Sequence, residues 1–106
     1  FIAGCGRIFE GNPAMMHTSL QRLAALPEQT RVWVGHEYTL ANLAFARQAE
    51  PDNPDLEPTL ARAEAARAEG LATVPSSIAL ERKINPFLRA KSIEELAERR
   101  QWKDNF

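Results

Sequence analysis

The chain has 106 residues, of which 44% are hydrophobic and 25% are charged, a composition typical of a folded domain rather than a disordered segment. Its formal net charge is −1, so we expect neither nucleic acid nor an anionic membrane as a partner. The apolar runs fall far short of the roughly 20 residues that a membrane-spanning helix needs. Because Cys5 is the only cysteine, no intrachain disulfide is possible, and a reducing, intracellular compartment is expected.

The first third of the chain is predicted to contain strand, helix and strand. Residues 1–3 have the pattern of the end of a buried strand, and a Gly-Cys-Gly turn follows them. Asn12 and Pro13 match the N-cap and first position of a helix, which the apolar spacing extends over 13–25. Residues 31–34 form a β-type run that stops at a glycine, so His36 is expected just beyond the carboxyl end of a strand. Ligand sites gather at that end in open α/β sheets.

From Thr39 onwards the pattern is helical. A helix is predicted from Thr39 to about residue 49, with Leu40, Leu43 and Ala44 on one face. Three further helices follow: one after Pro54 that ends at Gly70, a short one over 78–84, and a last one that opens with the Ser92–Glu95 capping box.

The histidines are candidate metal ligands, but there are only two, His17 and His36. A catalytic zinc commonly takes three protein ligands, so this chain alone is not expected to build a metal site. From spacing alone, His36 is either a ligand held at a strand end or, the reading we favour, a loop histidine that bonds to a backbone carbonyl. His17 is expected to be an exposed helix residue. Glu37 should point away from its neighbour and is not expected to be catalytic.

Cys5 lies between two glycines and could be a nucleophile, but no neighbour in the sequence would lower the pKa of its thiol. We therefore favour a small buried residue. Trp33 and Trp102 are interpreted as packing residues. Four basic side chains could gather a carboxylate, or could be solvated and offset by nearby acids. They are Arg7, Arg99, Arg100 and Lys103.

Six short motifs occur in order along the chain. They are FIAGCGRIFEG at 1–11, RVWVGHEYT at 31–39, NLAFA at 42–46, VPS at 74–76, NPFLR at 85–89 and KDNF at 103–106. Together they closely resemble the C-terminal part of glyoxalase II, the hydroxyacylglutathione hydrolases of the metallo-β-lactamase superfamily. The resemblance implies an α+β fold class. Residues 1–37 would be the last strands and helix of an αββα metallo-β-lactamase fold, and 38–106 a mostly α-helical substrate-binding domain.

The resemblance also implies the chemistry of a cytoplasmic enzyme of methylglyoxal detoxification. Such enzymes hydrolyse the thioester S-D-lactoylglutathione to D-lactate and glutathione. Two divalent metal ions, zinc with iron or manganese as variants, supply a hydroxide by lowering the pKa of a bridging water.

Site residues follow from the same motifs. His36 falls on the position of one metal ligand, and Tyr38 and Arg7 fall on positions that contact glutathione. Arg100 and Lys103 fall on the pair that holds the glycine carboxylate of glutathione, where the choice of Arg100 over Arg99 assumes an ungapped ending. Phe9 stands where the family often has a tyrosine.

The family's His-x-His-x-Asp-His motif, a further histidine and the bridging aspartate do not occur in these 106 residues. We therefore expect a fragment of a longer, monomeric hydrolase that is inactive by itself, does not retain the metal ions and self-associates. One alternative is a non-catalytic helical module whose basic tail binds an anion or an acidic peptide. Another keeps the fold but changes the thioester.

Overall fold

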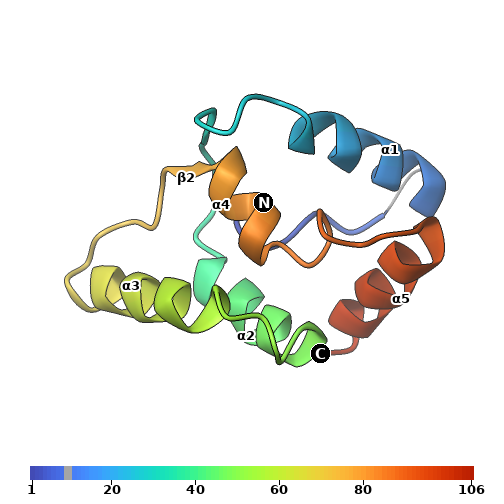
Figure 1. Ribbon diagram of the computed structural model, residues 1–106. Helices are drawn as coiled ribbons and strands as arrows, with labels where there is room; N and C mark the ends of the chain where they lie inside the picture. The colour runs from blue at the N-terminus through green and yellow to red at the C-terminus, as the bar shows by residue number, and fades with distance from the viewer. Residues whose placement is uncertain (9–10) are drawn as a thin grey trace.

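The computed structural model describes residues 1–8 and 11–106, so the expectation at Phe9 lies outside the described residues. Within this part of the chain there are five α-helices and one two-stranded sheet (Figure 1). The helices are α1 (Pro13–Ala24), α2 (Thr39–Ala49), α3 (Leu56–Ala68), α4 (Ile78–Ile84) and α5 (Ile93–Asp104), and the strands are β1 (Arg31–Val32) and β2 (Ser76–Ser77). None of these helices combines the length and apolar character that crossing a membrane requires.

The helices begin and end where the sequence predicts, because their caps are local. The Asn12 side chain accepts a hydrogen bond from the Met15 amide at 3.0 Å and caps α1. Ser92 accepts one from the Glu95 amide at 3.1 Å and caps α5. Gly70 has a φ of +75°, which suits the turn that ends α3. The helical predictions from Thr39 onwards are thus confirmed.

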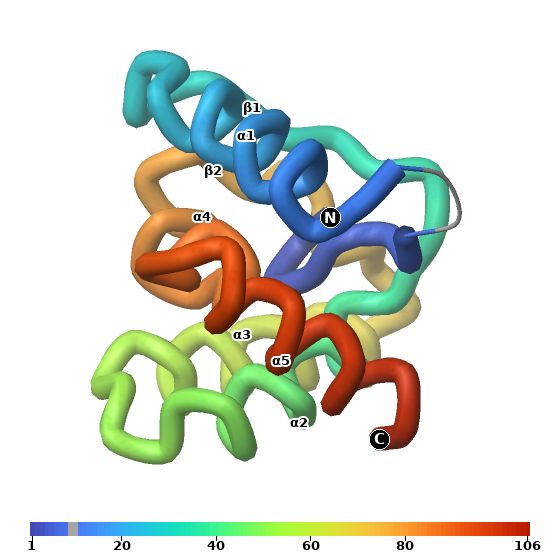
Figure 2. Tube along the Cα trace, turned by 90° about the vertical axis from the view of Figure 1, so that its right-hand side faces the viewer, coloured from blue at the N-terminus to red at the C-terminus, as the bar shows by residue number. Residues whose placement is uncertain are grey.

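The helices form two groups with the N-terminal segment between them (Figures 1 and 2). In one group α2 packs against α3, and in the other α1 packs against α4 and α5. The segment 1–5 runs through the middle and contributes Ala3 to the first core cluster. The second cluster is built from Leu20, Phe45, Phe87, Leu88, Ala90 and Leu96. At the other end of the chain the Phe106 ring lies 5.5 Å from that of Phe45, so both chain ends pack against residues that are distant in sequence.

Residues 1–3 are not a strand, which corrects the prediction for this segment. They form a turn in which the Gly4 amide donates to the Phe1 carbonyl at 2.8 Å. Side chains, rather than a neighbouring strand, satisfy the backbone here. The Ala3 amide donates to Glu81 at 2.9 Å, and Asn85 donates to the carbonyl of Gly4 at 2.8 Å. The segment is therefore anchored by buried polar residues of α4 and its C-terminal end.

The strand predicted over 31–34 is shorter than expected. Only Arg31 and Val32 pair, antiparallel to Ser77 and Ser76. Trp33 follows with 65% of its surface exposed, so its interpretation as a packing residue is wrong in this structure. A two-residue strand at a sheet edge offers no neighbouring side chains to cover an indole. That residues 1–37 belong to a metallo-β-lactamase fold stays a prediction.

The buried face of α2 also differs from the prediction. Leu43 is fully buried as expected, but Ala44 is exposed and Phe45 is completely buried. Phe45 stacks on Phe87 with ring centroids 5.8 Å apart and meets the edge of Trp102 at 5.2 Å. Because α2 packs on α3 with one side and on Phe87 and Trp102 with another, its buried surface is wider than a single apolar stripe. The helical period alone therefore did not identify Phe45 as a core residue.

Candidate functional site

One pocket of about 490 Å³ is lined by all five of the residues to which the family resemblance assigns a role in binding metal or glutathione. It lies between the N-terminal segment, the loop that precedes α2, the first turn of α2 and the last turns of α5. Its lining residues are Phe1, Cys5, Gly6, Arg7, Val34, Gly35, His36, Tyr38, Ala41, Asn42, Arg100 and Lys103. Residues almost a hundred positions apart in sequence thus share one concave surface, which is where ligand sites are found in proteins.

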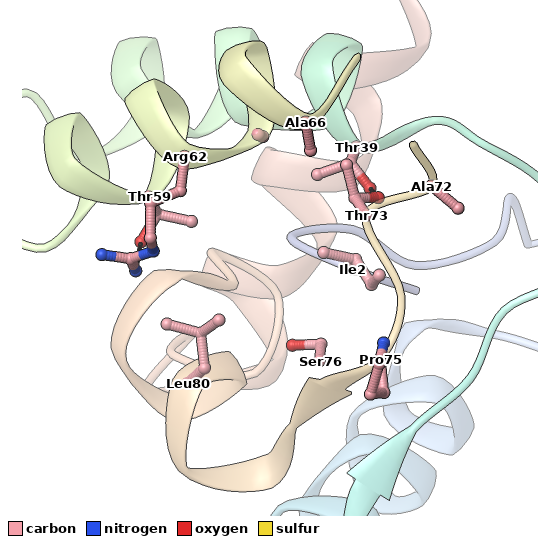
Figure 3. A pocket seen from close by; sticks show the side chains of 11 residues that line it. Ile2, Thr39, Thr59, Arg62, Ala66, Ala72, Thr73, Pro75, Ser76 and Leu80 are labelled. Atoms are coloured by element: carbon pink, nitrogen blue, oxygen red, sulfur yellow. Dashed lines mark hydrogen bonds between the residues drawn. The ribbon is translucent and has the colours of Figure 1, made fainter. Parts of the chain in front are cut away.

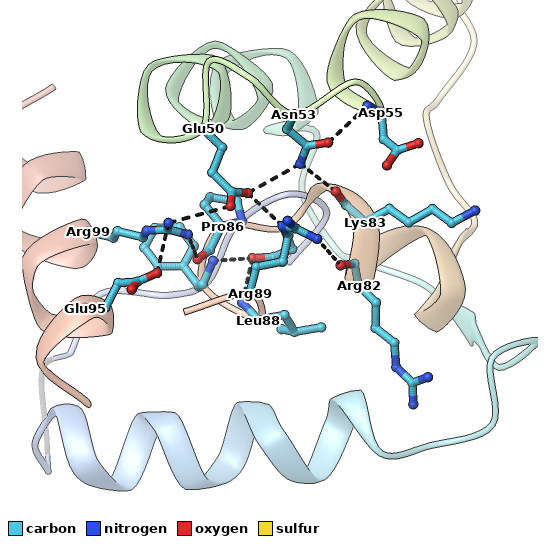
Figure 4. A network of polar contacts seen from close by, with 12 residues as sticks. Glu50, Asn53, Asp55, Arg82, Lys83, Pro86, Leu88, Arg89, Glu95 and Arg99 are labelled. Atoms are coloured by element: carbon cyan, nitrogen blue, oxygen red, sulfur yellow. Dashed lines mark hydrogen bonds and ion pairs between the residues drawn. The ribbon is translucent and has the colours of Figure 1, made fainter. Parts of the chain in front are cut away.

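Arg99 does not line this pocket. Its guanidinium lies 3.0 Å from Glu95 and 3.6 Å from Glu50, and it donates to the Pro86 carbonyl at 2.6 Å (Figure 4). Glu50 also accepts a hydrogen bond from Arg89 at 2.8 Å. This network joins the C-terminal end of α2 to α5 and holds the Arg99 guanidinium outside the pocket. The sequence left open whether Arg99 or Arg100 belongs to the site, and in the structure Arg100 lines the pocket.

Arg100 lines the pocket and also connects α5 to neighbouring segments, and only 6% of its surface is exposed. Its Nη1 donates to the Cys5 carbonyl at 2.6 Å, its Nη2 to Asp104 at 3.0 Å, and its guanidinium carbon lies 5.1 Å from the centre of the Phe87 ring. Its Nε is buried and has no hydrogen-bond partner among the described residues. Most of the hydrogen-bonding capacity of Arg100 therefore holds α5 to the N-terminal segment.

Arg7 and Lys103 are the more accessible cations of the pocket. The Arg7 side chain is 62% exposed and its Nε lies 3.6 Å from Asp104. Burial, and then the positive charge of Arg100, lower the pKa of Lys103 from its ordinary value of 10.5. Three cations against the single carboxylate of Asp104 leave an excess of positive charge, which favours an anionic ligand.

The loop before α2 presents two aromatic rings to the pocket. His36 and Tyr38 stack with their ring centroids 5.4 Å apart and their planes at 12°, and both are exposed. Glu37 between them does not line the pocket; its carboxylate accepts hydrogen bonds from the amide and hydroxyl of Thr73. Although its slight burial raises the pKa of Glu37, these hydrogen bonds outweigh the effect and the pKa lies below 4.5.

Cys5 has a neighbour that the sequence did not reveal, because Arg100 Nη1 lies 3.7 Å from its Sγ. Burial nevertheless raises the pKa of the Cys5 thiol above its ordinary value of 9.0, outweighing the opposite effect of Arg100. The half-buried thiol therefore carries little nucleophilic thiolate at neutral pH. His17 is half-buried rather than exposed, and its Nδ1 is buried without a partner among the described residues, which corrects that expectation.

The pocket supplies one imidazole for a metal ion. Residues 1–8 and 11–106 contain no group of three or more His, Cys, Asp or Glu side chains arranged to hold a metal. Metal centres of the kind that the resemblance implies need several such ligands. His36 alone does not fit a pair of divalent ions, so any such centre needs ligands from outside the described residues.

A second, smaller pocket of about 210 Å³ lies between α3, the start of α2 and α4 (Figure 3). Apolar side chains such as Ile2 and Leu80 form much of its wall, and the hydroxyls of Thr39 and Thr73 meet at 2.6 Å beside it. None of the ligand-binding or metal-binding residues predicted from the sequence lines this pocket.

Sequence reasoning missed Asn42 as a residue that shapes the larger pocket. Asn42 donates to the Ile2 carbonyl at 3.0 Å, and a Cβ added to Gly4 would lie 2.6 Å from its Nδ2. Gly4 is therefore required by the close approach of α2. The glycine itself was the available signal, since glycine is favoured where another group comes close to the backbone.

Comparison with known proteins identifies the class to which this fold and pocket belong. Residues 37–106, about two thirds of the chain, match the family model described as hydroxyacylglutathione hydrolase C-terminus. The chain therefore belongs to this family, which confirms the resemblance inferred from its motifs. Where the chain divides into domains stays a prediction.

Individual relatives carry the same name. A hydroxyacylglutathione hydrolase from Alkalilimnicola ehrlichii is 64% identical over 90 residues, covering 85% of this chain and 35% of the relative. One from Pseudomonas fluorescens is 52% identical over 107 residues, covering 99% of this chain and 42% of the relative. One from Shewanella oneidensis is 61% identical over 89 residues, covering 84% and 33%. The chain thus spans between a third and about two fifths of these relatives.

Proposed function

We propose that this chain forms the glutathione-binding part of a thioester hydrolase that cleaves S-D-lactoylglutathione to D-lactate and glutathione in the cytoplasm. The observation that carries the proposal is the convergence of Arg7, Arg100 and Lys103 with Tyr38 around one pocket, in a chain of the hydroxyacylglutathione hydrolase family. Glutathione carries two carboxylates, and cationic side chains recognise such groups through charge-assisted hydrogen bonds.

The three cations have different roles, which depend on how many of their hydrogen bonds are already made within the protein. Lys103 and Arg7 bind a carboxylate of glutathione directly, because their charged groups are not locked into backbone contacts. Arg100 adds its charge and the unpartnered Nε hydrogen, while its other nitrogens keep the walls of the pocket together. The Tyr38 ring, 60% exposed at the rim, contacts the peptide part of glutathione and offers a phenolic hydrogen bond.

His36 is proposed as one ligand of a centre of two divalent ions, zinc with iron or manganese as alternatives. A metal pair supplies a hydroxide for attack on a thioester carbonyl. The described residues do not fit such a pair alone. We propose instead that the 106-residue chain does not hydrolyse the thioester by itself and retains no metal ions.

The decisive experiment is a titration of the isotope-labelled chain with glutathione, followed by NMR. We expect saturable shifts at Arg7, Tyr38 and Lys103 and none at residues of the smaller pocket. A Lys103→Ala variant should bind more weakly, whereas Lys91→Ala, which removes an exposed cation away from the pocket, should not. If the pocket signals do not move at millimolar glutathione, the proposal is wrong.

Hydrolysis is tested in a fusion protein. The chain replaces the corresponding region of the Pseudomonas fluorescens relative, with which it aligns over 99% of its length. The fusion should hydrolyse S-D-lactoylglutathione and the chain alone should not, with or without added zinc. Turnover by the chain alone contradicts its proposed inactivity, and a fusion that folds but hydrolyses only other thioesters favours the alternative substrate.

The state of association is a separate proposal. Several large apolar side chains of α1 and of the segment that follows it in the chain are exposed, and apolar surface of this kind favours self-association. They are Met15, Leu23, Leu26 and Trp33. We expect light scattering to show a mass that rises with concentration for the isolated chain and a monomer for the longer protein. A sharp monomer at all concentrations of the chain would contradict this.

A further inference from the structure

Glu37 ties the loop that carries His36 and Tyr38 to a distant part of the chain. The Thr73 amide donates to Glu37 Oε1 at 2.9 Å, and the Thr73 hydroxyl lies 2.8 Å from Oε2. The Thr39 hydroxyl in turn lies 2.6 Å from the Thr73 hydroxyl, as the close approach of the two residues in Figure 3 shows. One carboxylate thus joins the loop to the connector between α3 and β2, from which Thr73 comes.

The loop needs such an anchor because it has little regular structure of its own. The chain belongs to neither a strand nor a helix from Trp33 to Tyr38, and the backbone bonds described there are short-range, such as Tyr38 N to the His36 carbonyl at 3.2 Å. The loop turns at Glu37, and His36 and Tyr38 line the pocket whereas Glu37 does not, so the carboxylate lies on another side of the loop than the two rings. When Glu37 is held on Thr73, the rings on either side of it face the pocket.

The two rings have few other restraints. Both are exposed, and their contact with each other is the one aromatic stacking interaction described for them. An exposed ring that is free to change rotamer loses conformational entropy when a ligand fixes it, which weakens binding. Holding the backbone on both sides of Glu37 reduces that loss before the ligand arrives.

We propose that Glu37 is a positioning residue of the pocket, which acts with Thr73 to keep Tyr38 and His36 stacked at its rim. That the ordered rim serves to bind glutathione rests on the proposed function. The arrangement of the rim itself is independent of any ligand. Glu37 does not line the pocket and touches no substrate group there, so its effect is transmitted through the loop.

The first test measures the rim without ligand. Stacked rings shift each other's proton signals, so the His36 ring signals of the chain should differ from those of a free imidazole. Glu37→Ala should move them towards the free value, while Glu37→Gln, whose amide oxygen still accepts from the Thr73 amide, should largely restore them. Glu64→Ala removes an exposed carboxylate on α3 and is the matched control. Unchanged His36 signals in Glu37→Ala would overturn the proposal.

The second test measures glutathione binding by the same variants. Glu37→Ala should raise the Kd about tenfold and Glu37→Gln less than about threefold, since fixing a free side chain on binding weakens the affinity by up to about tenfold. Because Glu37 acts through its neighbour, Glu37→Ala should have little further effect in a Tyr38→Ala background. Fully additive effects would overturn the proposal. If the unaltered chain binds no glutathione, the proposed function is wrong. The positioning role of Glu37 is then tested by the His36 signals alone.

The unfolding midpoint separates positioning from a general loss of structure. The Glu37 carboxylate is exposed, so loss of its hydrogen bonds to Thr73 should lower the midpoint of thermal unfolding by no more than about 8 °C, whereas Glu64→Ala should leave it unchanged. A fall in binding that is matched by a comparable fall in the unfolding midpoint would mean that Glu37 merely stabilises the fold, and would refute a positioning role.

Discussion

Replacement of Glu81 by alanine should strongly destabilise the chain. Glu81 is completely buried and accepts hydrogen bonds from the Ala3 amide at 2.9 Å, the Ser76 hydroxyl at 2.7 Å and Asn85 Nδ2 at 3.0 Å. Asn85 keeps two other acceptors, the carbonyls of Phe1 and Gly4. Two buried donors therefore lose their partner.

The magnitude follows from those two donors. A buried donor left unsatisfied costs about 1–3 kcal/mol, so Glu81→Ala should cost about 2–6 kcal/mol, partly offset because a buried charge disappears. A net loss of about 3 kcal/mol corresponds to a fall of roughly 12–24 °C in the unfolding midpoint of a domain of this size. Glu81→Gln should stay within about 1 kcal/mol, because the amide can accept from Ala3 and donate to Ser76.

The pH dependence of stability gives an independent check. Burial raises the pKa of Glu81 above 4.5, outweighing the hydrogen bonds from Ser76 and Asn85 that lower it. The folded chain therefore holds this proton more tightly than the unfolded chain. Stability from this group is fully present below pH 4.5 and is lost as the pH rises through the folded pKa. Glu81→Gln should lack this loss.

The assay is urea unfolding followed by circular dichroism at several pH values between about 4 and 7.5, for the unaltered chain and both variants. Equal destabilisation by alanine and glutamine would show that the carboxylate itself is required and that an amide of the same shape cannot replace its hydrogen bonds. A Glu81→Ala chain as stable as the unaltered one would refute the reasoning altogether.

Three further predictions concern the pocket and its walls. Gly4→Ala should destabilise the chain by about 1–3 kcal/mol in thermal unfolding, because the new methyl would lie 2.6 Å from Asn42 Nδ2; an unchanged midpoint would show that α2 can yield. Lys103→Ala should weaken glutathione binding about tenfold in calorimetry, the value of one charge-assisted hydrogen bond, and a smaller effect at high salt should accompany it. Asp104→Asn should strengthen binding about two- to fivefold, because it removes the carboxylate that competes for Arg7 while the amide oxygen can still accept from Arg100 Nη2, and weaker binding would contradict this.

The sequence predicted the helices well because their determinants are local. Asn12, Ser92 and Gly70 act within a few residues of where they stand, and the structure has the corresponding helix ends. The segment 1–3 was predicted wrongly because its surroundings are not local. Its backbone partners, such as Glu81 and Asn85, come from about 80 positions away, and no pattern in the apolar residues reveals them.

The candidate site shows the same division. The resemblance singled out Arg7, Tyr38, Arg100 and Lys103 from motifs at both ends of the chain, and the structure shows them around one pocket. What the motifs did not reveal is that Arg100 is occupied with backbone carbonyls, because a residue type does not specify how many of its hydrogen bonds are already made. Their roles in binding stay predictions until the titration is done.

The contact between Arg100 and the carbonyls of Cys5 and Gly6 joins positions about 95 residues apart. A nascent polypeptide emerges from the ribosome with its amino end first. The wall of the pocket formed by Cys5 and Gly6 is therefore complete only after the residues up to Arg100 have been synthesised. Truncated translation products that lack the last helix would present no finished binding surface, whatever their other helices do. Recognition thus requires a molecule whose synthesis has proceeded through α5.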